Sequence, residues 1–321
     1  ILMEKHVKLY VMKMELLLHY VIHKRMLENI TKHHNSSKAD YRFSILIPTW
    51  NNLDYLKLCI SSIKRNSSLD IQLIVIVNEG NDGTVEWLKE QGDIDFILSK
   101  ENIGICYALN ISRSLIKSDY MVYMNDDMYV LPNWDTELDK EITNMSHKSF
   151  MLSSTMIEPF DTGNPCVVVK NYGETADEFD EQKLLKECHA LTTQDWNGST
   201  WPPNLMHRDL WDLVGGMSIE FSPGMYSDPD LSRKLYEAGV RHFKGLGKSL
   251  VYHFGSKSTK KLKKSRGREL FLFKWGITSN VFMNKIIHVG EPFRILKDST
   301  SIRLDILIGK VKMLFTSNKR R

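Results

Sequence analysis

The chain has 321 residues, of which 42% are hydrophobic and 26% are charged, and its formal net charge is +4. This composition excludes a disordered or fibrous protein, and the length suits one large catalytic domain with appendages or two modest domains. The near balance of charge gives no reason to expect nucleic acid as a partner. Basic residues nevertheless gather in residues 257–268 and at the very end of the chain.

The four cysteines are widely spaced and form no Cys-x-x-Cys pair. They indicate neither a zinc site nor a disulfide scaffold, and a reducing cytoplasm is the simplest setting for them. No apolar run reaches the roughly 18 residues of a spanning helix, and the first residues lack the apolar core of a signal peptide. We therefore expect a cytoplasmic protein.

Residues 1–41 are expected to form an amphipathic helical appendage, because apolar residues recur there at three- and four-residue spacing among Lys and His. From residue 42 onwards, short apolar strands alternate with amphipathic helices. This alternation predicts an α/β fold with a mostly parallel sheet flanked by helices. The predicted strands are 43–47, 71–77, 96–98 and 121–124, and the predicted helices are 54–65, 84–89 and 103–116.

After Pro132 the pattern loosens. We expect a helix over 133–145, apolar segments at 150–155 and 166–169, a polar insertion at 173–187, and renewed periodicity at 208–214, 229–238 and 249–253. The segment 257–321 is basic and ends in an amphipathic helix with Ile306, Leu307, Val311, Leu314 and Phe315 on one face. Docking on the parent domain is the commoner use of such a helix. Peripheral contact with an anionic membrane is the alternative.

The pair Asp126-Asp127, with Asn125 before it, follows the apolar run 120–124. Adjacent carboxylates at the carboxyl end of a strand repel each other unless a cation lies between them and a ligand. A hard divalent ion that carries a diphosphate meets this requirement. An isolated Asp-Asp pair is more often a solvated turn, so the interpretation depends on the other motifs.

Four further motifs have the order and character of a nucleotide-sugar site. A buried strand ends in polar residues, a second delivers an amide and an acid into a Gly-rich loop, and a small residue at a helix start permits close backbone approach. The last motif combines carboxylates with a later His. The motifs are Pro48-Thr49-Trp50-Asn51, Asn78-Glu79-Gly80, Asn102-Ile103-Gly104, and Ser227-Asp228-Pro229-Asp230-Leu231 with His253.

With these motifs, residues 42–256 resemble the family-2 glycosyltransferases, which are inverting enzymes with a Rossmann-like, A-type glycosyltransferase fold. The resemblance implies a nucleotide-binding half, 42–132, and an acceptor-binding half, 133–256. It also implies a nucleotide-diphosphate sugar donor, a saccharide or glycolipid acceptor, and Mn²⁺ or Mg²⁺ as cofactor. Two departures from the family pattern stand out: Asn78 replaces an acidic residue, and Ser227 replaces a common Glu.

The resemblance assigns roles to single residues. The metal would be bound by Asp127, with Asp126 and His253 completing the set. Asn78 can accept a hydrogen bond from the N3–H of a pyrimidine, so uridine is the expected base. The residues expected to bind the donor nucleotide are Pro48, Thr49, Asn51, Asn78, Asn102, Gly104, Asn125 and Asp126.

Transfer also needs a carboxylate that takes the proton of the attacking acceptor hydroxyl, and Asp228 is the candidate. Asp228 followed by Pro229 also has the pattern of a helix N-cap, and the two roles are compatible. Trp196, Trp201 and Asp230 are expected on the acceptor side, where an aromatic ring can stack on a sugar face. In the basic stretch after His253, a Ser or Lys could close over the diphosphate.

Two other functions would each explain part of the sequence. A sugar-phosphate nucleotidyltransferase would carry a Gly-rich, Arg-containing loop after its first strand, where this chain has Pro48-Thr49-Trp50-Asn51. A non-enzymatic module associated with membrane or nucleic acid would explain the basic ends of the chain but not the motifs between them. Metal-dependent donor hydrolysis separates an enzyme from such a module.

Overall fold

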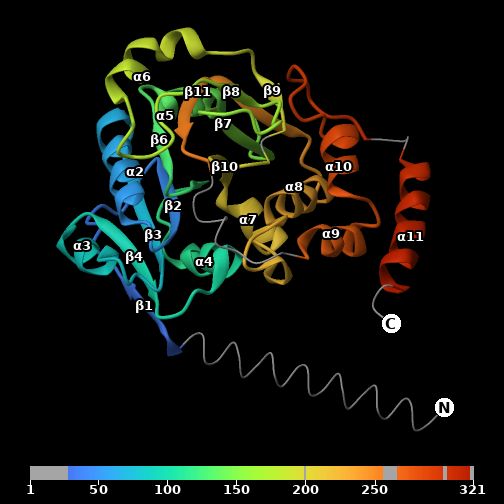
Figure 1. The fold of residues 1–321 in the computed structure, drawn as a ribbon, viewed down its shortest axis with the longest axis horizontal. Coiled ribbons are helices and arrows are strands. Elements are labelled where there is room, and N and C mark those ends of the chain that lie inside the picture. Colours follow the sequence, from blue (N-terminus) through green and yellow to red (C-terminus); the bar gives the residue numbers. More distant parts are fainter. Residues whose placement is uncertain (1–27, 199, 256–265, 299–301, 319–321) are drawn as a thin grey trace.

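The computed structural model describes residues 28–198, 200–255, 266–298 and 302–318. Within these ranges, eleven strands form one sheet with helices on both faces (Figure 1). The order along the sheet is β1-β4-β3-β2-β5-β10-β7-β11-β6, with β8 paired to β7 and β9 paired to β11. The strands are β1 (Ile30–His33), β2 (Phe43–Trp50), β3 (Ile71–Asn78), β4 (Ile94–Ser99), β5 (Tyr120–Tyr123), β6 (Met128–Val130), β7 (Phe150–Glu158), β8 (Val167–Val169), β9 (Trp196–Asn197), β10 (Asn204–His207) and β11 (His242–His253).

The helices divide between the two faces of the sheet. One hydrophobic cluster joins the sheet to α2, α3 and α5, and the other joins it to α4, α7, α8 and α9. Their bounds are α2 (Leu53–Asn66), α3 (Thr84–Glu90), α4 (Gly104–Ser112), α5 (Trp134–Asn144), α6 (Glu181–Glu187), α7 (Arg208–Val214), α8 (Ser227–Glu237), α9 (Gly267–Trp275), α10 (Ser279–Val281) and α11 (Arg303–Asn318), with the π-helix η5 (Phe282–Ile286) after α10.

The strands β4, β3, β2 and β5 are parallel neighbours, as predicted. Side chains alternate between faces along a strand, so Ile45 and Ile47 pack in one cluster while Leu46 packs in the other. This double burial explains why the strands are almost wholly apolar. β10 is antiparallel to both β5 and β7, and β11 is parallel to β7. The strands β2, β3, β4, β5, β7, β8 and β11 therefore have their carboxyl ends at one edge.

The predicted helical appendage 1–41 is wrong for residues 30–33, which form β1. This strand pairs antiparallel with β4, and the ring of His33 stacks on Phe96 with centroids 4.1 Å apart. The backbone of β4 would otherwise be an open sheet edge, and β1 satisfies its hydrogen-bonding groups. Residues 1–27 lie outside the described residues, so the helix prediction there stays a prediction.

The predicted boundary at residue 256 does not separate two hydrophobic cores. Phe271 of α9 and Phe282 of η5 are fully buried in the cluster that also contains Leu231 and Leu235 of α8. Residues 266–298 thus belong to the same hydrophobic core as α8. The structure does not describe 256–265, where closure over the diphosphate was expected.

The helix α11 docks on this domain, which was the favoured prediction. Ile306 packs against the core, and a Cβ built on Gly309 would lie 1.8 Å from the carbonyl oxygen of Gly276. The predicted apolar face is divided, because Leu307 and Val311 are exposed. The side chains of residues 314 and 315 lie outside the described ones.

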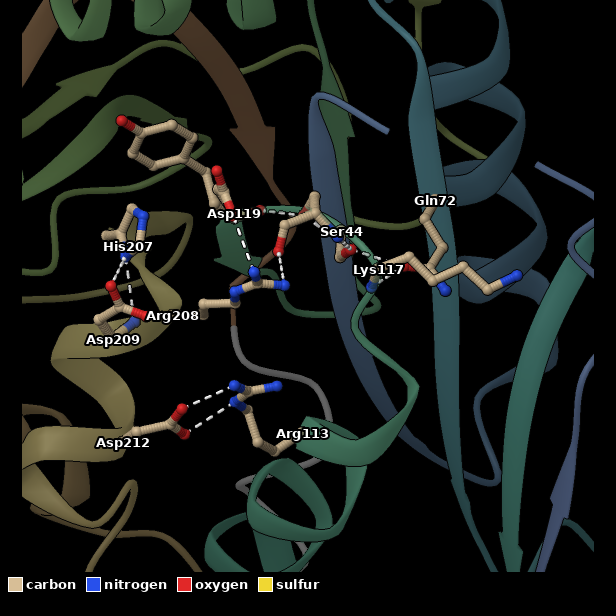
Figure 2. Close-up of polar contacts among 11 residues, drawn as sticks. Ser44, Gln72, Arg113, Lys117, Asp119, His207, Arg208, Asp209 and Asp212 are labelled. Carbon is tan, nitrogen blue, oxygen red and sulfur yellow. Dashed lines mark hydrogen bonds and ion pairs between the residues drawn. The ribbon is translucent and has the colours of Figure 1, made fainter. Parts of the chain in front are cut away.

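A buried polar network joins the amino ends of β2 and β3 (Figure 2). Ser44 Oγ donates to Gln72 Oε1 at 2.6 Å, and Gln72 Nε2 donates to Asp95 Oδ2 at 2.6 Å. Ser118 Oγ donates to Ser44 Oγ, and the backbone N–H of Lys117 donates to Gln72 Oε1. Each of these buried side chains has a protein partner, so the network stabilises this end of the sheet.

Candidate functional site

A cavity of about 580 Å³ lies at the carboxyl ends of β2, β3, β5, β7 and β11. In open α/β sheets this edge is where ligands bind. The structure brings most of the predicted site residues to its walls, although they lie far apart in the sequence. Those that line the cavity are Pro48, Thr49, Asn78, Asn102, Gly104, Asn125, Asp126, Asp127, Trp201, Asp228 and His253.

Asn51 is not among the residues that line the cavity. Its Nδ2 donates to Glu79 Oε2 at 3.2 Å, and its Oδ1 accepts from the backbone N–H of Asn81 at 2.7 Å. Both ends of the amide are therefore used to hold the loop after β3. Asn51 shapes the site indirectly, and its predicted contact with the donor is not supported.

Two residues predicted on the acceptor side also lie away from the cavity. Trp196 Nε1 donates to Thr155 Oγ1 at 2.8 Å, and its ring fills the space beside Gly245, where a Cβ would lie 2.0 Å away. Asp230 is fully buried and accepts from Trp275 Nε1 at 2.8 Å. Their residue types suit a sugar site, but the packing makes both of them structural, which corrects the prediction.

At the part of the cavity wall that contains Gly104, two segments of the chain lie close together. A Cβ built on Gly104 would lie 2.4 Å from Ser222 Oγ, and its φ of +73° also favours Gly. Asn78 Oδ1 accepts from the backbone N–H of Ile103 at 3.0 Å. The oxygen predicted to accept from the base is thus already used by the backbone. No described residue accepts from Asn78 Nδ2, so this amide would present a donor to a base.

On the opposite wall, His253 lies between two carboxylates. Its Nδ1 is 2.7 Å from Glu158 Oε1, and its Nε2 is 3.3 Å from Asp127 Oδ1. All three side chains are buried. Burial alone would lower the pKa of His253, but the charges of Asp127 and Glu158 outweigh it and raise the pKa to about 10.

Asp126 is a buried acid with an unsatisfied oxygen. Its Oδ2 has no partner of normal hydrogen-bond geometry among the described residues, and the same is true of Thr49 Oγ1 and Asn52 Nδ2, which nevertheless lie near enough to Asp126 to oppose the rise of its pKa. Burial raises the pKa of Asp126 to about 7, and the charge of Asp127 adds to the rise. An unpaired buried carboxylate is costly, so this wall suits a cation or a hydrogen-bond donor from a ligand.

A divalent cation fits part of the predicted metal set. Asp127 Oδ1 and His253 Nε2 both line the cavity and lie close enough to bind one ion together. Within the described ranges, however, no group of three His, Cys, Asp or Glu side chains is arranged to hold a metal. The predicted triad with Asp126 is therefore not preassembled. The remaining ligands would have to come from the donor diphosphate and water.

Asp228 faces the cavity from the first turn of α8. This helix begins at Ser227, and its N-cap is Tyr226 with φ 72°, so the predicted N-cap role of Asp228 is wrong. The hydrogen bond from the N–H of Ser227 to the oxygen of Gly224 turns the chain one residue earlier than expected. Asp228 keeps some exposure, but its Oδ1 is buried without a partner, and burial raises its pKa to about 7.

Several residues of the cavity wall were missed by the sequence analysis. Glu158 ends β7 and is followed by Pro159, which could have marked it as the end of a strand at the site. Asn280 and Met283 come from α10 and η5, in a segment expected to lie outside the catalytic domain. They belong to no motif, so only the fold brings them to the site.

Comparison with known proteins gives the family. Residues 44–186 match the family model described as Glycosyl transferase family 2. These residues form a family-2 glycosyltransferase domain. The match includes the motifs at the carboxyl ends of β2, β3 and β5, and the predicted family is confirmed.

Relatives of known name extend this result. An uncharacterized glycosyltransferase of Haemophilus influenzae is 24% identical over 53% of this chain and 46% of its own length. The hyaluronan synthase of Pasteurella multocida is 24% identical over 68% of this chain and 21% of its own length. The chain thus spans less than half the length of these relatives.

Among solved structures, S. aureus TarS 1–349 is similar with a TM-score of 0.50 and 11% identity, covering 73% of this chain and 65% of that one. Its complex with UDP-GlcNAc is similar with a TM-score of 0.50 and 10% identity, over 72% and 65% of the two chains. This likeness confirms the predicted A-type glycosyltransferase fold.

Proposed function

We propose that this glycosyltransferase is an inverting, metal-dependent enzyme that moves a sugar from a uridine-diphosphate sugar to a saccharide or glycolipid acceptor. The observation that carries the proposal is the cavity itself. It places Asp126, Asp127 and His253 together with Asp228 around one space at the carboxyl ends of the strands. A donor diphosphate on the first group and an acceptor hydroxyl at Asp228 would enclose the anomeric carbon.

The metal is Mn²⁺ or Mg²⁺ in this proposal, held by Asp127 and His253 with Asp126 beside them. When bound, it stabilises the negative charge that develops on the leaving diphosphate. The imidazole favours Mn²⁺ over Mg²⁺. Pro48, Thr49, Asn102, Gly104 and Asn125 line the cavity where the nucleotide would lie. Asn78 Nδ2 would donate to a carbonyl oxygen of the base, which uracil offers.

Asp228 is the general base in this proposal. The acceptor oxygen attacks the anomeric carbon, the bond from that carbon to the diphosphate oxygen breaks, and the hydroxyl proton passes to Asp228. Attack from the side opposite the diphosphate inverts the anomeric configuration. A pKa near 7 suits this role, because a base is most effective when its pKa is near the working pH.

The acceptor would lie against the part of the wall formed by Trp201, Met156, Tyr226 and Met283. These side chains offer the flat apolar surface on which a sugar face can pack. The polar groups at this part of the wall include Asn280, whose side chain has no hydrogen-bond partner among the described residues and could receive an acceptor hydroxyl.

The reaction can be tested with the purified full chain and a panel of nucleotide sugars. We expect hydrolysis or transfer from a UDP-sugar when Mn²⁺ is present, and loss of that activity with a chelator. NMR of the released sugar should show the inverted anomer first. Activity that is insensitive to chelation, or a product of retained configuration, would contradict the corresponding part of the proposal.

Peripheral contact with the inner face of the membrane is also proposed, through the outer face of α11. None of the described helices is long and apolar enough to cross a membrane. The exposed apolar residues of α11 are Leu304, Leu307, Ile308 and Val311, each at least 43% exposed. Arg303 and Lys310 are exposed beside them, whereas Asp305 is paired with Lys285. Apolar side chains flanked by cations suit an anionic lipid surface.

A further inference from the structure

The arrangement of His253 follows from the register of three strands. β11 lies between β7 and β6 in the sheet. Tyr252 pairs with Ile157 of β7, so Glu158 and His253 occupy the next positions of the same ladder. On the other side His253 pairs with Met128 of β6, and the N–H of Phe254 donates to the oxygen of Asp127 at 3.1 Å. The sheet therefore places one carboxylate on each side of the ring.

The two carboxylates contact different nitrogens of the ring. Glu158 Oε1 lies 2.7 Å from Nδ1 and Asp127 Oδ1 lies 3.3 Å from Nε2. A carboxylate accepts hydrogen bonds, so Nδ1–H donates to Glu158. Nε2 is then the nitrogen that faces Asp127, the residue to which metal binding is assigned.

Glu158 is itself firmly held. Its Oε2 accepts from Thr162 Oγ1 at 3.0 Å, and its backbone oxygen accepts from the N–H of Lys170 at 2.9 Å. Only 4% of the residue is exposed. Both carboxylate oxygens are occupied by protein donors, so Glu158 is arranged to orient the ring and not to bind a ligand directly.

We propose that Glu158 is a positioning residue. It fixes the orientation of the His253 ring, so that Nε2 and Asp127 form a ready pair for a divalent cation. Partners of this kind hold metal-binding imidazoles in place, and removing them typically weakens metal binding 10- to 100-fold. The inference rests on the proposed metal dependence and adds to it a residue that lies outside the recognised motifs.

The test measures the affinity of the full chain for Mn²⁺ in the presence of saturating UDP. The electron paramagnetic resonance signal of free Mn²⁺ reports how much of the ion is unbound. Glu158→Leu removes the acceptor and should weaken Mn²⁺ binding about 10- to 100-fold. Glu158→Gln keeps an oxygen that can accept from Nδ1, and its affinity should stay within about 3-fold of wild type, because the ring keeps its hydrogen bond.

The other end of β11 offers a matched control. There the buried His242 faces Glu141, with Nε2 3.5 Å from Oε1. Glu141→Leu removes a carboxylate from a His on the same strand, but far from the cavity lining. It should change thermal stability without changing Mn²⁺ affinity.

The outcomes separate the inference from the proposed function. If wild type binds Mn²⁺ and Glu158→Leu binds it equally well, the inference is wrong and the proposed function stands. If wild type binds no Mn²⁺ with UDP, the proposed metal dependence fails and the inference fails with it. If Glu158→Leu does not fold, Glu158→Gln is compared with His253→Ala, which removes the proposed metal ligand itself. A loss of Mn²⁺ affinity in Glu158→Gln as large as that in His253→Ala would contradict positioning by a hydrogen bond.

Discussion

Buried polar groups have hydrogen-bond partners at one end of the parallel strands and lack them at the other. At the amino ends of β2 and β3, Ser44 and Gln72 have protein partners in a closed network (Figure 2). At the carboxyl edge, Thr49 Oγ1, Asp126 Oδ2 and Asp228 Oδ1 are buried without a partner among the described residues. Ser44 and Thr49 are both hydroxyl residues on the single strand β2. The type of side chain therefore does not explain why one has a partner and the other has none.

A buried polar group without a partner costs about 1–3 kcal/mol, and more if it is charged. The amino ends of β2 and β3 avoid this cost, and the segments at the carboxyl ends of β2 and β5 do not. Such a cost is explained if a ligand supplies the missing partners. The comparison therefore assigns stability to the amino ends of the strands and ligand binding to their carboxyl ends. Substitutions at each end test this assignment.

The largest expected effect is at Asp228. Asp228→Asn keeps the size of the side chain but cannot accept the acceptor's proton, so sugar transfer should fall about 10²- to 10⁴-fold. UDP affinity should be almost unchanged. Asp230→Asn is the control two residues along the helix: it weakens the buried contact with Lys274 and should lower stability more than rate. A variant Asp228→Asn with near wild-type transfer would assign the base elsewhere.

The pH dependence gives an independent measure of Asp228. Because its folded-state pKa is raised to about 7, the rate should rise with pH through about 7, as the base loses its proton. The stability that Asp228 contributes is present below its unfolded pKa near 4 and is lost as pH rises through about 7. The melting temperature of Asp228→Asn relative to wild type should therefore be higher at pH 8 than at pH 5. An identical difference at both values would contradict the raised pKa.

The next effect is on donor binding. Asp127→Ala removes a predicted metal ligand, so Mn²⁺ should no longer strengthen UDP binding, a loss of about 10- to 100-fold. The variant should still fold, but the loss of the buried contact with His253 Nε2 should lower its stability, so the titration is made where the variant is native. Calorimetric titration of UDP with and without Mn²⁺ measures this. Unchanged metal dependence in the variant would show that the cation binds elsewhere.

At the amino ends the expected effect is on stability. Gln72→Leu would leave Ser44 and Asp95 without their amide partner, at a cost of about 1–3 kcal/mol in the free energy of unfolding. Chemical denaturation measures it. UDP affinity under native conditions should be unchanged, and a loss of affinity without a loss of stability would contradict the division between the two ends.

The smallest effect concerns the membrane. Leu304→Asp on α11 should reduce co-sedimentation with anionic vesicles several-fold, because it places a negative charge among exposed apolar residues. Leu213→Asp on α7 is a matched control, since the two leucines are 67% and 68% exposed. Equal binding by both variants would remove α11 as the contact surface.

The sequence predicted the first half of the fold well, because its signals are local. The strands before Asn78 and Asn125 are continuous apolar runs, and each ends in a short motif that the fold brings to one edge. The short strands β9 and β10 lacked such runs. β1 was missed because Ile30–His33 is set by pairing with β4, a contact over more than sixty positions of chain.

The errors at the site have the same origin. Asp230 is expected on the acceptor side as a member of the motif Ser227-Asp228-Pro229-Asp230-Leu231, but the helix directs it toward Trp275. Asn78 Oδ1 is expected to accept a hydrogen bond from the base, but it already accepts one from the backbone N–H of Ile103. Residue type and spacing indicated the chemistry, whereas the use of each polar atom depends on tertiary neighbours that the sequence does not display.

The most direct test of the account measures stability and donor binding on the same samples. Wild type, Gln72→Leu and Asp127→Ala would each be unfolded with denaturant and titrated with UDP in Mn²⁺. The account predicts that Gln72→Leu loses stability and keeps UDP affinity, while Asp127→Ala loses the Mn²⁺-dependent part of its UDP affinity in addition to the stability of the His253 contact. If Gln72→Leu lost UDP affinity under native conditions, or if Asp127→Ala kept its Mn²⁺-dependent UDP affinity, the separation of the two ends of the strands would be wrong.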